Sequence, residues 1–89
     1  MTVSIITLPD GRFVFDKPSV TIHIGDSVKW VNNTLAPHTT TSDPGDPASW
    51  DADLLNEHDS FTMKFTIAGT YGYSCMIHPN MPGKVIVTA

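Results

Sequence analysis

The sequence predicts an all-β protein, a sandwich of about seven or eight short strands. Apolar and polar residues alternate along several short segments, which is the pattern of half-buried strands. Glycine, proline and aspartate mark turns between these segments, and no segment has the period of an amphipathic helix. A chain of 89 residues has room for one small core, so we expect a single domain over 1–89.

The first part of the chain contains four expected strands. Segment 3–8 is rich in β-branched residues, and the turn at 9–11 separates it from extended structure at 13–15. In segment 20–24, Val20, Ile22 and Ile24 occupy alternate positions. A turn at Gly25-Asp26 then leads to segment 28–32, in which Val28 and Trp30 are expected to face inward.

The second part is less regular. Segment 33–60 has no clear period, and so long a loop in a small domain is usually functional or a strand edge in disguise. Segment 61–67 alternates again and predicts a strand with one apolar face, followed by a turn at Gly69-Thr70. Tyr71, Tyr73 and Cys75 are expected to share an inward face. A last strand is expected around Val85 and Val87.

The residues with the most distinctive chemistry follow the Tyr73 strand. Cys75, His78 and Met81 form the pattern C-x2-H-x2-M, which places a thiolate, an imidazole and a thioether on one short loop. These ligands favour copper, and two histidines, one cysteine and a weak axial methionine are the ligand set of a blue-copper site. His38 is the best candidate for the fourth ligand.

Each of these residues also has an ordinary explanation. A lone cysteine is often a small buried hydrophobe, a histidine before a proline is often on the surface, and most methionines belong to the core. The short spacing between Cys75, His78 and Met81 favours the metal interpretation. Zinc fits less well, since structural zinc sites use several cysteines or a Cys2His2 set. The other histidines and methionines are expected to be solvated or part of the core: His23, His58, Met63 and Met76.

Together the motifs resemble the small cupredoxins of the plastocyanin–amicyanin type, and the likeness covers nearly the whole chain. The segments that carry it are GDSVKWVN at 25–32, WDADLL at 50–55, FTMKF at 61–65, GTYGYSC at 69–75 and GKVIV at 83–87. The two residues between His78 and Met81 match the short amicyanin spacing. His38 follows the Trp30 strand, where the family has its first histidine.

The resemblance implies a cupredoxin-like Greek-key sandwich with one type 1 copper ion, Cu(II)/Cu(I), held by His38, Cys75, His78 and Met81. It implies a soluble, monomeric one-electron carrier rather than an enzyme, since four protein ligands leave no open position for a substrate. The expected location is the periplasm or another extracytoplasmic space. No signal peptide is visible in this chain.

Two positions depart from the family pattern. Thr39 stands where family members often have asparagine after the first histidine, and its hydroxyl is expected to tie the two ligand loops together. Ile77 stands where they often have proline, which restores a backbone N–H. If this N–H donates to the Cys75 sulfur, it would raise the reduction potential.

The expected partners are redox proteins such as a cytochrome or a dehydrogenase or oxidase. They would dock near His78 on an apolar collar. The expected collar is Pro37, Met76, Pro79, Met81 and Pro82. A run of six acidic residues between Asp43 and Asp59 is either a solvated loop or a patch that steers a basic partner.

Composition excludes several other classes. A net charge of −4 without a basic stripe argues against nucleic-acid binding, and no apolar run is long enough for a membrane span. One cysteine cannot form an internal disulfide. The alternative function is a copper-binding delivery or storage protein with a cupredoxin fold, which usually has more methionine or cysteine ligands. A domain of a multicopper enzyme would need an H-x-H pair, which this sequence lacks.

Overall fold

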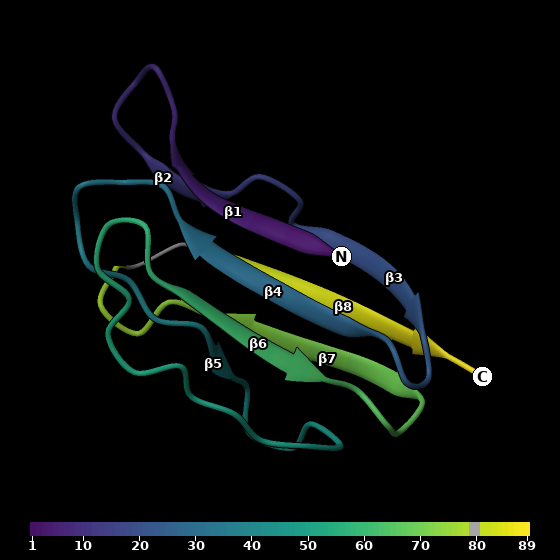
Figure 1. Cartoon of the computed structure of the whole chain (residues 1–89). Helices are drawn as coiled ribbons and strands as arrows, with labels where there is room; N and C mark the ends of the chain where they lie inside the picture. Colours follow the sequence, from purple (N-terminus) through teal and green to yellow (C-terminus); the bar gives the residue numbers. More distant parts are fainter. Residues whose placement is uncertain (79–80) are drawn as a thin grey trace.

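The computed structural model describes residues 1–78 and 81–89 as a sandwich of two four-stranded sheets, with no helix in that part of the chain (Figure 1). One sheet has the strand order β2-β1-β4-β6 and the other β3-β8-β7-β5. The pairs β1–β4 and β3–β8 are parallel, and the other neighbours are antiparallel. The strands are β1 (Thr2–Thr7), β2 (Phe13–Phe15), β3 (Ser19–His23), β4 (Ser27–Asn32), β5 (Thr41–Ser42), β6 (Ser60–Lys64), β7 (Gly69–Ser74) and β8 (Pro82–Thr88).

The core lies between the sheets and is rich in aromatic rings. Val28 and Trp30 of β4 are fully buried, as their alternation predicts, and Tyr73 of β7 is 1% exposed. Trp50, from the irregular segment after β5, stacks on Trp30 with ring centroids 5.6 Å apart, and Tyr73 meets Trp30 edge to face at 5.2 Å. Trp50 therefore brings part of the long segment into the core.

The structure corrects the expected strand ends. Gly69 and Thr70 are not a turn but the first residues of β7, paired with Val87 and Ile86. Ile24 and Ile67 continue the apolar alternation of their segments, yet they are 46% and 53% exposed. Both lie beyond the last residue of their strand, where the chain turns away and alternation no longer determines which side faces the core.

The long segment 33–60 contains one short strand and is otherwise tied down by isolated contacts. β5 pairs with the end of β7, and single bridges join His38 to Leu55 and Thr41 to Asp51. Of the two alternatives expected for this segment, β5 is therefore the strand edge. The described residues contain no helix that is long and apolar enough to cross a membrane.

The segments that follow β4 and β7 meet at one end of the sandwich, the end away from the C-terminus (Figure 1). They carry His38 on one side and Cys75, His78 and Met81 on the other. Pro79 of the expected collar lies outside the described residues.

Candidate metal centre

Cys75 and His38 come together although 37 positions separate them in the chain. Cys75 directly follows β7 and is 5% exposed, and His38 has no exposed surface. The distance from Cys75 Sγ to His38 Nδ1 is 3.7 Å. Two donors bound to one ion, with metal–sulfur and metal–nitrogen bonds of roughly 2.3 and 2.0 Å, lie about 3.5–3.7 Å apart at tetrahedral to trigonal angles. The pair therefore fits two ligands of one metal ion.

His38 is fixed through both its main chain and its ring. Its N–H donates to Leu55 O at 3.0 Å, and its carbonyl accepts from Leu55 N–H at 2.7 Å. Its Nε2 lies 2.9 Å from Thr34 Oγ1. Burial removes the ring from water and, with a smaller contribution from nearby His78, lowers the pKa of His38 to about 4. The imidazole is therefore neutral at pH 7, the form that binds metal.

His78 lies against His38, with ring centroids 4.5 Å apart, and is partly exposed. Its Nε2 is 3.1 Å from the carbonyl oxygen of Pro37. A carbonyl can only accept, so Nε2 carries a proton, and in the neutral ring Nδ1 then keeps a free lone pair. Phe13 of β2 packs against both rings, with centroids 4.8 Å from His38 and 4.9 Å from His78.

Met81 is 3% exposed and belongs to the same buried cluster as Cys75. Its carbonyl accepts the Cys75 N–H at 3.3 Å, which closes the loop between the two residues. Within residues 1–78 and 81–89, no three histidine, cysteine or carboxylate side chains have the separations of a complete metal site. The structure thus brings His38 and Cys75 within the separation of two ligands of one ion, and His78 and Met81 belong to the loop that follows Cys75.

Thr39 connects the two ligand-bearing segments. Its N–H donates to Cys75 Sγ at 3.4 Å, and its hydroxyl accepts the Met76 N–H at 2.9 Å. The expectation that the Thr39 hydroxyl ties the segments together is confirmed. The structure shows no hydrogen bond from the Ile77 N–H to Sγ among the described residues. The donor to the sulfur is Thr39, which belongs to the neighbouring segment.

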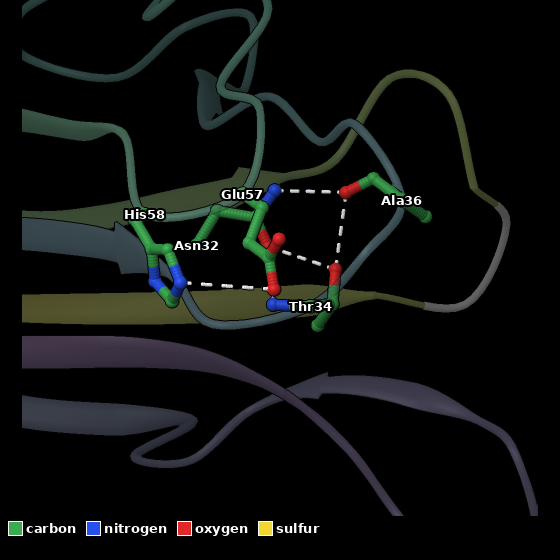
Figure 2. A network of polar contacts seen from close by, with 5 residues as sticks. All are labelled: Asn32, Thr34, Ala36, Glu57 and His58. Atoms are coloured by element: carbon green, nitrogen blue, oxygen red, sulfur yellow. Dashed lines mark hydrogen bonds and ion pairs between the residues drawn. The ribbon is translucent and has the colours of Figure 1, made fainter.

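A buried polar network supports this end of the sandwich (Figure 2). Asn32, at the end of β4, donates to the carbonyls of Ala36 and Leu55, each at 2.8 Å. Thr34 lies between Asn32 and His38 and contacts both. Beside it, the exposed side chains of Glu57 and His58 approach each other at 3.7 Å. His58 thus remains on the surface, as expected.

Comparison with known proteins shows which family the chain belongs to. The family model for copper binding proteins of the plastocyanin/azurin family matches residues 3–88. The chain belongs to the plastocyanin/azurin family of copper-binding proteins. Copper is therefore its cofactor, in agreement with the ligand chemistry of the His38–Cys75 pair.

Individual relatives agree with this family membership. The chain is 45% identical over 87 residues to the chloroplastic plastocyanin of Tetradesmus obliquus and covers 60% of it; the match includes 86% of this chain. It is 37% identical over 78 residues to amicyanin-alpha of Methylorubrum extorquens, covering 66% of that protein and 85% of this chain. The chain thus spans about two thirds or less of the length of these relatives. A reduced amicyanin with a tryptophan-to-tyrosine mutation superposes with a TM-score of 0.85 and 29% identity, covering 98% of this chain and 80% of the amicyanin.

Several residues of this copper protein were missed by sequence reasoning. Phe13 was expected only to resume a strand, and Thr34 was one residue of the irregular segment 33–60. Nothing local in the sequence marks Phe13. Asn32 gave a usable signal, because it occupies an inward position of β4 and a buried amide must find partners.

The residues expected to form the apolar collar around His78 are partly wrong. Met81 is buried and cannot present a surface to a partner, whereas Leu35, which was not expected there, is 87% exposed. Met76 is 70% exposed and Ile77 44% exposed. Met76 points away from the buried pair, as expected. His23, on exposed positions of β3, and Met63, half-buried on β6, do not join the site.

Proposed function

We propose that the chain is a one-electron carrier, not an enzyme, in which His38, Cys75, His78 and Met81 hold a single type 1 copper ion. The observation that carries this proposal is the buried His38 Nδ1–Cys75 Sγ pair at 3.7 Å, with the ring of His78 tilted against that of His38 at a centroid distance of 4.5 Å. When bound, copper supplies the one-electron redox couple. The protein supplies a soft, mostly buried ligand set that fits both oxidation states.

The four residues would have different tasks. Cys75 supplies a thiolate whose sulfur also accepts the Thr39 N–H, which lowers the electron density on sulfur. His38, buried and hydrogen-bonded, fixes the geometry. Met81 is the long axial ligand. His78, the partly exposed histidine, is the route by which an electron enters or leaves.

A redox protein such as a cytochrome, a dehydrogenase or an oxidase would dock over His78. Support comes from exposed apolar side chains on the two segments that carry His38 and His78. Pro37 accepts the His78 hydrogen bond and is exposed, and Leu35, Met76 and Ile77 are exposed on the two adjoining segments. An apolar contact of this kind excludes water from the imidazole edge. The proposed location is extracytoplasmic, by analogy with the family.

The acidic run has a structural role in part. Asp51 and Asp59 each accept a backbone N–H within the loop, from Asp53 and Asn56. This supports the solvated-loop interpretation for those two residues. Steering of a basic partner remains a proposal for the run as a whole, and it predicts an association rate that falls as ionic strength rises.

The test is the visible absorption spectrum of the purified apoprotein after addition of Cu(II), repeated after ascorbate. We expect an intense thiolate-to-copper band that disappears on reduction and returns on reoxidation. Met81→Leu should shift the reduction potential, and Met76→Leu, which changes an exposed methionine on the same loop, should not. A weak band with copper that a mild chelator removes would favour the delivery or storage function instead.

A further inference from the structure

The Asn32 side chain has no exposed surface, and its hydrogen bonds fix its orientation. One end of its amide lies 2.8 Å from Ala36 O and 2.8 Å from Leu55 O. Both carbonyls can only accept, so this end must be the NH2 group. The other end, Oδ1, accepts the Thr34 N–H at 2.9 Å. The surrounding main chain therefore fixes which way the Asn32 amide points.

The Thr34 hydroxyl has a single proton to donate. Thr34 Oγ1 has three neighbours: Asn32 Oδ1 at 2.8 Å, Ala36 O at 3.0 Å and His38 Nε2 at 2.9 Å (Figure 2 shows the first two). The first two are oxygen acceptors. If the hydroxyl proton pointed at His38, Thr34 Oγ1 would face two acceptor oxygens with no hydrogen between them. The proton therefore goes to one of those oxygens, and a lone pair of Oγ1 is left for a donor on His38.

We propose that Asn32 and Thr34 are positioning residues that hold His38 as its Nε2–H tautomer, with an unprotonated Nδ1 facing the Cys75 sulfur before any metal binds. The inference rests on the proposed role of His38 as a ligand. In the opposite tautomer, Nδ1 would carry a proton, and this proton would have to leave before copper could bind. The network thus presets the metal-binding nitrogen of His38, as the Pro37 carbonyl does for His78.

The direct test is 15N-detected tautomer analysis of His38 by NMR in the apoprotein, which needs no metal. We expect the Nε2–H tautomer in the wild-type protein and in Thr34→Ser, which keeps the hydroxyl. In Thr34→Val the Nε2–H loses its buried acceptor, so the population should shift toward Nδ1–H, which can donate to Cys75 Sγ. Thr40→Val is the matched control, because it removes a buried hydroxyl that contacts Trp50 rather than His38.

The second readout is Cu(I) affinity, measured by competition with a chromophoric chelator. We expect Thr34→Val to bind Cu(I) about tenfold or more weakly than wild type, and Thr34→Ser and Thr40→Val to bind it normally. A His38 with Nδ1–H in the wild-type apoprotein would overturn the proposal, even if Thr34→Val did not fold. A Thr34→Val protein with unchanged tautomer or unchanged affinity would also overturn it. Failure of the proposed function is a separate result, the absence of the intense copper band in the wild-type protein.

Discussion

His38 and His78 lie 4.5 Å apart, but the two segments that carry them are built differently. His38 has no exposed surface, and the Leu55 main chain and the Thr34 hydroxyl hold it in place. His78 is partly exposed, and its described polar contact is the Pro37 carbonyl. In the proposed function, the first segment is the fixed half of the centre, and the second is the half that would face a partner. An electron carrier needs ligands that move little on reduction and also an accessible route for the electron, and this division would provide both.

The largest expected effect comes from Cys75, which belongs to the second half and contacts His38 and Thr39 of the first. Cys75→Ser should abolish the intense absorption band and weaken copper binding by about 100-fold or more, because a hydroxyl is a poor ligand for copper. The neighbouring substitution Ser74→Ala is the control and should leave the spectrum unchanged. An intense band in Cys75→Ser would mean that another set of residues binds the metal.

The second half is anchored by packing where its loop enters β8. A Cβ on Gly83 would overlap the ring of Tyr73, which is 1% exposed and held between Trp30 and Phe15. We therefore expect Gly83→Ala to lower the free energy of unfolding by about 2–3 kcal/mol. Chemical denaturation of the apoprotein measures this.

Lys84→Ala, at the adjacent exposed position of β8, is the control and should change the free energy of unfolding by less than about 0.5 kcal/mol. If Gly83→Ala were as stable as wild type, the Tyr73 ring would be able to move, and packing would not be what anchors the second half.

The first half should dominate the acid sensitivity of the apoprotein. The pKa of His38 is about 4 in the folded protein, below its ordinary value of 6.5, so the unfolded chain binds a proton first as pH falls. The stabilising effect of a neutral His38 is therefore complete above pH 6.5 and is lost between about pH 6.5 and 4. The loss should reach up to about 3 kcal/mol.

Urea titrations at several pH values would measure this loss. In His38→Gln the decline over this pH range should be much smaller than in wild type. His23→Gln, which removes an exposed histidine of β3, is the matched control and should follow the wild-type curve. An equal decline in His38→Gln and wild type would contradict the assignment.

The same division explains what could be predicted from the sequence. Cys75, His78 and Met81 lie within seven consecutive residues, so their spacing alone predicts a ligand loop. The alternation of Val28 and Trp30 likewise identifies the inward face of β4. His38 needed the family resemblance, because its approach to Cys75 depends on the pairing of distant strands.

Phe13 and Thr34 could not be predicted, since their roles depend on contacts that form only after the sheets pack. Ile24 and Ile67 show the opposite error, in which the sequence predicts burial that the structure lacks. Their apolar alternation continues past the residues at which the strands end. Local periodicity cannot report where a strand leaves its sheet.

The smallest expected effect comes from Thr39, and it tests how the two halves are joined. Thr39→Val keeps the backbone N–H that donates to Cys75 Sγ but removes the hydroxyl that accepts the Met76 N–H. We expect a loss of about 1 kcal/mol in stability and faster hydrogen exchange of the Met76 amide, with little change in reduction potential. Thr39→Ser should restore the slow exchange. If the Met76 amide of Thr39→Val stays as protected as in wild type, the hydroxyl does not tie the halves together. If the potential shifts as well, the side chain acts on the sulfur and not only on the loop.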